Sequence, residues 1–246
     1  MKIEVKDLYK SFNGNNVLQG VNLEIPEGRI TCIVGGSGSG KSVLLKHLNG
    51  ILRPDSGHVV VDGKDISGLP ESSLYGMRRR MALIFQSGGL LGSLNVGENV
   101  GLGLKEHNLA SEDEIRDIVR EKLDLVQLGG IEDKMPANLS GGMKKRVSIA
   151  RGLTLNPELI LYDEPTAGLD PPMAQAIDDL ILELSRDLKV TSVVVTHDLT
   201  SVFKLADTVN MLYKGNIIES APPEKWRESD NEIIRNFIGR EVELEK

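Results

Sequence analysis

The sequence predicts an α/β fold in which a largely parallel sheet is covered by helices on both faces. Short runs rich in β-branched residues alternate with longer stretches of helical periodicity, which is the pattern of an α/β domain. Residues 159–162 and 193–195 are apolar at almost every position. Strands of that kind are buried on both faces and are typical of parallel sheets. A long segment, residues 88–138, has almost no strand pattern and predicts an inserted helical region.

Composition narrows the class of protein. The chain has 246 residues, with 36 acidic and 29 basic side chains and a formal net charge of −7. A mildly acidic surface argues against binding to nucleic acid through bulk electrostatics, so no nucleic-acid partner is expected. Hydrophobic residues make up 40% and charged residues 26%, the profile of a globular chain and not of a disordered one.

Cellular location is predicted from three features. No apolar run approaches the roughly 18 residues that a membrane-spanning helix needs. The first residues mix charged and apolar side chains and lack the apolar block of a secretory signal. The single cysteine, Cys32, cannot form an internal disulfide, fits a reducing cytosol, and is expected to be a small buried residue of a strand.

Periodicity and turn residues place the elements along the chain. Nine segments are predicted strands: residues 2–5, 17–25, 29–34, 58–61, 81–85, 159–162, 192–196, 208–213 and 216–219. In the helical region, Ser111 and Glu114 have the spacing of a capping box, and apolar residues then recur on one helical face. The stretch before it is rich in glycine and is expected to be flexible (Gly88, Gly89, Gly92, Gly97, Gly101 and Gly103).

A glycine-rich loop follows the predicted strand at residues 29–34. It fits the pattern G-x-x-x-x-G-K-[ST] and consists of Gly35, Gly36, Ser37, Gly38, Ser39, Gly40, Lys41 and Ser42. Glycines let successive backbone N–H groups point at phosphate oxygens, and the start of the following helix adds roughly half a positive charge. Lys41 would face the β- and γ-phosphates, and the Ser42 hydroxyl would bind Mg²⁺. A plain Gly/Ser turn needs no Lys-Ser pair at this offset, so the loop predicts ATP binding.

Two carboxylates end the apolar strand at residues 159–162. Asp163 is expected to hold Mg²⁺ through water. Glu164 lies one residue further on, where it could accept a proton from the attacking water; a base of this kind contributes about 10²–10⁴-fold. Asp-Glu-Pro alone is typical of a solvated turn, but its pairing with the phosphate loop favours the catalytic interpretation.

A third motif identifies a family. Leu139-Ser140-Gly141-Gly142-Met143 resembles the signature L-S-G-G-Q of ABC ATPases, with methionine at the fifth position. The other elements of that family follow in order along the chain: Phe12 resembles its adenine-stacking aromatic, Gln86 its Q-loop glutamine, Asp170 the end of its D-loop and His197 its switch histidine. The resemblance implies that Gln86 and His197 act in catalysis with Glu164, and that Gln86 also contacts Mg²⁺.

The resemblance also implies the architecture. It would be a P-loop NTPase core, with a mixed, largely parallel sheet and an antiparallel β subdomain, plus the inserted α-helical subdomain of ABC type. Residues 1–87 and 158–220 would form the core, 88–157 the helical subdomain with the signature, and 221–246 a C-terminal helical tail. All three parts belong to one ATPase domain.

One chain has one phosphate loop and one signature. Ser140, Gly141 and Gly142 form a second anion-binding helix start. ABC ATPases form head-to-tail dimers in which the signature of one subunit closes on the γ-phosphate held by the other. The resemblance therefore implies an ATP-dependent homodimer in which Ser140, Gly141, Gly142 and Asp170 act in trans.

Two smaller features carry expectations. The run Lys144-Lys145-Arg146 is typical of a solvated basic face, although an approach to nucleotide or membrane stays open. Trp226 is expected to pack the C-terminal segment.

Shorter strings resemble one branch of the family, the ATPases of MCE-type lipid transporters of the Mla system (maintenance of lipid asymmetry). They lie at residues 85–91, 98–100, 104–107 and 232–239. The resemblance implies two copies docked on membrane permease subunits at the cytoplasmic face of the inner membrane, with MCE-domain and regulatory subunits as further partners. Residues 86–99 would receive the permease. An importer of amino acids or another polar solute shares every catalytic motif and stays open, as does, more remotely, a non-transport ABC ATPase.

Overall fold

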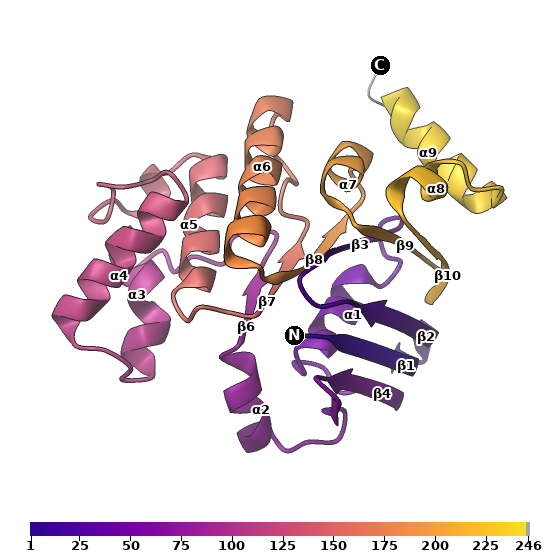
Figure 1. The fold of residues 1–246 in the computed structure, drawn as a ribbon, viewed down its shortest axis with the longest axis horizontal. Coiled ribbons are helices and arrows are strands. Elements are labelled where there is room, and N and C mark those ends of the chain that lie inside the picture. Colours follow the sequence, from indigo (N-terminus) through magenta and orange to yellow (C-terminus); the bar gives the residue numbers. More distant parts are fainter. Residues whose placement is uncertain (245–246) are drawn as a thin grey trace.

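The computed structural model describes residues 1–244, which form two β-sheets, a group of helices on one side and a C-terminal helical segment (Figure 1). The larger sheet has the strand order β10-β9-β3-β8-β7-β6. All neighbours from β9 to β6 are parallel, and β10 pairs with β9 antiparallel. Its strands are β3 (Ile30–Val34), β6 (Met81–Ile84), β7 (Leu159–Asp163), β8 (Thr191–Thr196), β9 (Thr208–Tyr213) and β10 (Asn216–Ala221).

The smaller sheet is antiparallel, with the order β2-β1-β4-β5. Its strands are β1 (Ile3–Phe12), β2 (Asn15–Ile25), β4 (Ser56–Val61) and the two-residue β5 (Lys64–Asp65). Both sheets of the predicted fold class are therefore present, the parallel core and the antiparallel subdomain. The structure adds β5, and it extends β1 to Phe12, well beyond the predicted segment at residues 2–5.

Helices cover the larger sheet and form a separate group at one side. Helices α3, α4 and α5 gather on the side of β6, away from the antiparallel sheet (Figure 1). The helices are α1 (Lys41–Leu48), α2 (Glu71–Arg78), α3 (Val96–Glu106), α4 (Glu112–Leu125), α5 (Gly141–Leu153), α6 (Pro171–Leu188), α7 (Leu199–Leu205), α8 (Pro223–Arg227) and α9 (Glu232–Leu244), with a 3₁₀ turn at Pro136–Asn138. Residues 245–246 of the predicted tail lie outside the described residues.

Two hydrophobic cores lie on opposite faces of the parallel sheet, because successive side chains of a strand point to opposite faces. On β3, Cys32 and Val34 belong to the core that includes α5, α6 and α7, whereas Ile33 belongs to the core formed with α1 and the antiparallel sheet. Strands β3, β7 and β8 are buried at every position, as the apolar runs predicted. The carboxyl ends of these strands meet at one edge of the sheet, where the predicted site residues lie.

The helical region differs from the prediction in one respect. Gly97, Gly101 and Gly103 belong to helix α3 and not to a flexible loop. A Cβ atom on Gly101 would lie 2.7 Å from Cγ2 of Ile115 in α4, so the glycine permits close packing of the two helices. The capping box of Ser111 and Glu114 is confirmed at the start of α4, and α3 begins with a second box formed by Asn95 and Glu98.

Two further expectations can be compared with the structure. Trp226 is fully buried and lies with its ring near Phe203 and Phe237, so it packs the C-terminal segment as predicted. Across residues 1–244, no helix has the length and apolar character required to cross a membrane.

Candidate functional site

The glycine-rich loop connects the buried strand β3 to helix α1. Gly38 and Gly40 have φ values of 76° and 102°, and Gly40 caps the helix. Both values lie in the region that L-residues with a side chain seldom adopt, which accounts for the glycines. At the entry to the loop, a Cβ atom on Gly35 would lie 2.4 Å from the carbonyl oxygen of Leu212 in β9. The loop thus lies directly against the neighbouring parallel strand.

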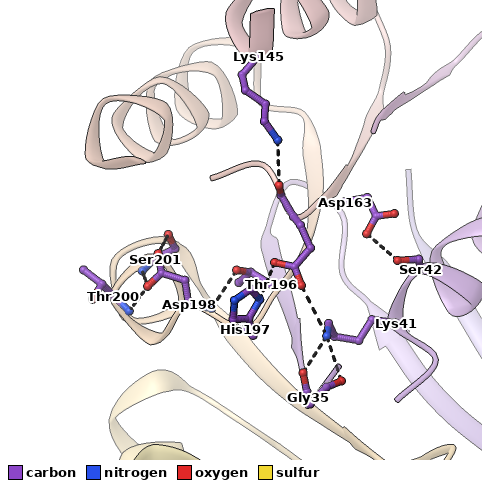
Figure 2. A network of polar contacts seen from close by, with 12 residues as sticks. Gly35, Lys41, Ser42, Lys145, Asp163, Thr196, His197, Asp198, Thr200 and Ser201 are labelled. Atoms are coloured by element: carbon purple, nitrogen blue, oxygen red, sulfur yellow. Dashed lines mark hydrogen bonds and ion pairs between the residues drawn. The ribbon is translucent and has the colours of Figure 1, made fainter. Parts of the chain in front are cut away.

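Lys41 and Ser42, the first two residues of α1, point toward the strand ends. The buried ammonium of Lys41 donates to the carbonyl oxygens of Gly35 and Gly36 at 2.7 and 3.3 Å. The Ser42 hydroxyl donates to Oδ1 of Asp163 at 2.8 Å. Figure 2 shows the Ser42–Asp163 and Lys41–Gly35 contacts close to each other, so the predicted phosphate and metal groups share one site. The Ser39 hydroxyl is buried and has no hydrogen-bond partner among residues 1–244, which fits a loop built to meet a polar ligand.

Glu164 lies at the centre of the polar network. Its Oε2 lies 2.9 Å from Nδ1 of His197, and its Oε1 lies 3.6 Å from Nζ of Lys41. Asp163 and Glu164 are each only 9% exposed, in agreement with their place at the end of the buried strand β7. His197 follows β8, which pairs with β7, and this register brings the two side chains together. The predicted constellation of Lys41, Asp163, Glu164 and His197 is therefore assembled in one place.

Lys41, Glu164 and His197 line a cavity of about 660 Å³, a size within the usual range of roughly 300–1,000 Å³ for ligand pockets. Seven of the eight predicted loop residues line it, together with Gln86, Glu164 and His197, so the sequence located most of its wall. Val17 of β2 and Phe237 of α9 also line it, and sequence reasoning missed both. The sequence signal for Phe237 was its helical spacing from the apolar residues Ile233 and Ile234 of the C-terminal segment.

Phe12 is not among the described residues that line this cavity. It ends β1, is 40% exposed, and its ring lies under the ammonium of Lys10 at 5.4 Å from the ring centroid. Its contact with adenine stays a prediction.

Lys145 corrects the prediction of a solvated basic run. It is buried at 6% exposure, whereas its neighbours Lys144 and Arg146 are partly exposed. Its ammonium donates to the carbonyl oxygen of Glu164 at 3.1 Å and to that of Gln86. Burial lowers the pKa of this ammonium, while the charges of Glu164 and Asp163 act in the opposite direction. Lys145 lies three residues after the buried Gly142 and four before the buried Ile149, a helical spacing that could have indicated its burial.

The signature residues begin helix α5 and lie outside the described wall of the cavity. Ser140 is exposed, and its hydroxyl caps the helix by accepting from the backbone N–H of Met143 at 3.3 Å. The two glycines that follow it pack against residues 169–173. A Cβ atom added to Gly141 would lie 3.3 Å from the Leu169 side chain, and one added to Gly142 would lie 3.2 Å from the Met173 side chain. Asp170 caps α6 through the N–H of Met173 at 3.0 Å. The four residues predicted to act in trans are therefore not brought to the Lys41 site of their own chain.

The residues present fit a bound Mg²⁺. Magnesium prefers oxygen ligands and usually keeps several waters when it is held with substrate phosphates. The hydroxyl of Ser42 and the carboxylate of Asp163 are adjacent, and Gln86 lines both the cavity and the depression that contains Asp163. Across residues 1–244, no group of three or more His, Cys, Asp and Glu side chains could hold a metal by itself. Phosphate oxygens of a bound nucleotide would supply further ligands to such an ion.

A second polar cluster lies at the start of α7, next to His197 in the sequence. The Ser201 hydroxyl lies 2.8 Å from Oδ2 of Asp178 and 3.1 Å from Oδ2 of Asp198, the residue after His197. Asp178 is 2% exposed, and its Oδ1 has no partner among residues 1–244. Burial is the main cause that raises the pKa of Asp178 to about 6, and the hydrogen bond from Ser201 opposes it.

Comparison with known proteins agrees with this geometry. The sequence profile of the ABC transporter family matches residues 18–167. A Mycobacterium leprae protein named "Probable ribonucleotide transport ATP-binding protein mkl" is 42% identical over 98% of this chain and 70% of its own length. The intermembrane phospholipid transport system ATP-binding protein MlaF of Haemophilus influenzae is 38% identical over 96% of this chain and 89% of its own length.

Solved structures give the same result. The dimeric ATP-binding cassette MJ0796, bound to ADP and Pi, superposes with a TM-score of 0.83 at 32% identity, covering 90% of this chain and 98% of that one. The match extends over the core and the helical group alike. The chain therefore belongs to the ABC transporter family, as one of its ATP-hydrolysing, ATP-binding proteins.

Proposed function

We propose that this ATPase powers a phospholipid transporter of the MCE type, docked on permease subunits at the cytoplasmic face of the inner membrane. Family membership establishes that the chain hydrolyses ATP for a transporter. The proposal adds the substrate, the location and the partners other than a second copy and a permease. The observation that carries it is the likeness to MlaF over nearly the full length of both proteins.

The geometry of the site supports the following roles. Glu164 accepts the proton of the attacking water, and His197 holds the Glu164 carboxylate from the β8 side. Lys41 and the loop amides bind the β- and γ-phosphates. Ser42, Asp163 and Gln86 would hold Mg²⁺, which neutralises charge on the phosphates when bound. Lys41, Ser42, Asp163, Glu164 and His197 each make a side-chain contact in the polar network of Figure 2. Gln86 contacts this network through its backbone carbonyl, which accepts from Lys145.

The working unit that we propose is a head-to-tail homodimer. Ser140 and Gly141 are exposed, and the signature residues lie outside the wall of the chain's own cavity. A helix start of this kind suits a phosphate, and a second copy can bring one to it. Two composite sites then form across a two-fold axis, each with the Lys41 loop of one chain and Ser140 of the other.

A lipid substrate is favoured by the strings at residues 85–91, 98–100, 104–107 and 232–239, which resemble the MCE branch. The alternative is an importer of a polar solute, because the M. leprae relative is named for ribonucleotide transport. The catalytic residues are common to both alternatives, and the substrate contacts other subunits, so only a transport measurement separates them.

The decisive experiment purifies the chain with its partners from membranes, identifies them by mass spectrometry, and rebuilds the complex in vesicles. ATP-dependent transfer of labelled phospholipid, lost in a complex that carries Glu164→Gln, would support the proposal. ATP-dependent uptake of labelled ribonucleotide without lipid transfer would contradict it and favour the alternative. Recovery of an MCE-domain subunit would support the partner assignment.

A further inference from the structure

Two buried lysines contact the catalytic centre, and ATP binding explains only one of them. Lys41 belongs to the phosphate loop. Lys145 belongs to α5 and is equally buried, yet it lies outside the wall of the nucleotide cavity. Figure 2 shows Lys145 and Lys41 reaching toward the centre of the network from opposite sides. A lysine side chain normally extends to water, so a buried ammonium indicates that its partners hold it.

The first partner is the peptide group of the base. Glu164 has a φ of 49°, a left-handed conformation that is uncommon for a residue with a side chain. Conformations of this kind persist where the surrounding structure holds them, and they are concentrated at functional sites. The backbone N–H of Glu164 donates to Val195 of β8 at 2.8 Å, and its carbonyl accepts from Lys145 at 3.1 Å. The same carbonyl also accepts from the backbone N–H of Ala167 at 3.2 Å, so Lys145 supplies one of three hydrogen bonds to the backbone of the base and the only one from a side chain among residues 1–244.

The second partner is the loop that carries Gln86. The same ammonium donates to the carbonyl oxygen of Gln86. Six residues further along α5, Arg151 donates to the carbonyl oxygens of Gly88 and Gly89 at 3.1 and 2.8 Å. Gly88 and Gly89 both have positive φ values, so this segment has little conformational restriction of its own. Two cations of α5 thus hold the backbone of residues 86–89.

We propose that Lys145 is a positioning residue for ATP hydrolysis: its ammonium links the backbone of Glu164 to that of Gln86 and so fixes the base relative to the Q-loop. This inference rests on the proposed catalytic roles of Glu164 and Gln86. Ser140 caps the same helix. Helix α5 therefore carries both Ser140, which is proposed to meet the second copy, and Lys145, which holds the backbone of Glu164 in its own chain. The alternative is that Lys145 only fills space with its alkyl chain. In that case methionine, which has a similar stem, should replace lysine without loss of kcat.

The test compares three variants: Lys145→Met, Lys145→Arg and Lys144→Met. Methionine keeps the length and apolar stem of Lys145 and removes its three donors, whereas arginine keeps donors. We expect Lys145→Met to lower kcat by about tenfold, equal to ~1.4 kcal/mol of activation free energy, with KM and the dissociation constant for ATP changed less than about twofold. Lys145→Arg should recover most of kcat. Lys144→Met is the matched control, because Lys144 lies one residue away, is partly exposed, and should behave as wild type.

Amide hydrogen exchange distinguishes local positioning by Lys145 from a general contribution to stability. In Lys145→Met, amides of residues 86–89 and 164–167 should exchange faster, with the melting temperature close to that of wild type. If that variant folds poorly, Lys145→Gln, which keeps a neutral donor, should fold and show an intermediate kcat.

Two results would overturn the inference. One is a wild-type kcat in Lys145→Met; the other is a loss of kcat that matches losses of ATP affinity and melting temperature and is not recovered by arginine. A wrong assignment of the catalytic base gives a different result. If Glu164 is not the base, Glu164→Gln keeps full turnover, whatever the effect of Lys145→Met.

Discussion

The carboxylate of Glu164 and the imidazole of His197 are joined by a 2.9 Å contact between Oε2 and Nδ1, although 33 residues separate them in sequence. The other carboxylate oxygen of Glu164 faces the ammonium of Lys41 at 3.6 Å. One carboxylate therefore connects the ends of two parallel strands to the phosphate loop. A group in this position can accept a proton while its orientation is set by two neighbours.

Glu164→Gln should separate binding from chemistry. Glutamine keeps the size and one acceptor oxygen but cannot act as a base, so hydrolysis should fall by about 10²-fold or more, while ATP affinity is retained. Phosphate release at saturating ATP and a nucleotide titration measure the two quantities. Turnover within about tenfold of wild type would show that another group accepts the proton.

Lys41→Ala should lose most ATP binding. The ammonium is buried within the loop and held by two loop carbonyls, so its removal takes away the positive charge expected to face the phosphates. Isothermal titration calorimetry with ATP measures the effect. Near-wild-type affinity in this variant would contradict the assignment of the loop.

Ser140→Arg should block turnover and leave nucleotide binding by the single chain intact. Ser140 is exposed and caps the start of α5, so a large side chain is tolerated in the monomer and should block only the composite site that it enters. Dimers that pair a Lys41→Ala chain with a Ser140→Arg chain should regain activity, because one composite site then keeps both of its intact halves. The control mixes each variant chain with wild-type chains. If those mixtures are active and the dimers of the two variants stay inactive, Ser140 does not act in trans.

Gly35→Ala should destabilise the fold at the entry to the loop. The added methyl would lie 2.4 Å from the carbonyl oxygen of Leu212, which is backbone and cannot rotate away. Overpacking of this kind costs about 1–3 kcal/mol and should lower the melting temperature by roughly 2–10 °C. Gly36→Ala is the matched control, since no atom lies within 4 Å of its added Cβ. Equal melting temperatures for the two variants would refute the steric explanation.

Asp178→Asn should change how stability depends on pH. Because burial raises the pKa of Asp178 to about 6 in the folded chain, the folded state binds this proton more tightly than the unfolded state. The contribution of Asp178 to stability is therefore fully present below its unfolded pKa of roughly 3.9 and is lost as pH rises through about 6. Asparagine carries no charge, so its advantage over wild type should grow from near zero at low pH to on the order of 2–3 kcal/mol at pH 7.5.

Denaturant unfolding of both proteins between pH 5 and pH 8 measures this difference. Asp179→Asn is the control, because the Asp179 side chain is 54% exposed and its ion pair with Lys204 lies at the surface. A constant difference between Asp178→Asn and wild type across the range would show that Asp178 does not titrate there.

Much of the site was predictable because its signals are local. The phosphate loop, the carboxylates at the end of β7 and the N-caps at Ser111 and Ser140 depend on spacings of a few residues, which backbone geometry alone restricts. The nine predicted strands all occur, since runs of β-branched residues bounded by turn residues favour strands wherever they are packed. Helix α3 was missed because its glycines lower helix propensity, and packing of Gly101 against α4 outweighs that loss.

The sequence alone assigned the residues expected to meet phosphate and the residue proposed as base, because these groups belong to motifs a few residues long. Only the tertiary structure decided that Lys145 is buried against Glu164 and Gln86, and that Phe237 and not Phe12 lines the cavity. It also decided that Asp178 is buried with one oxygen that has no partner among residues 1–244. Each of these depends on contacts between elements far apart in the chain. Their environments arise only when helices α5, α6 and α9 pack against the sheet, and no local pattern records which surfaces will meet.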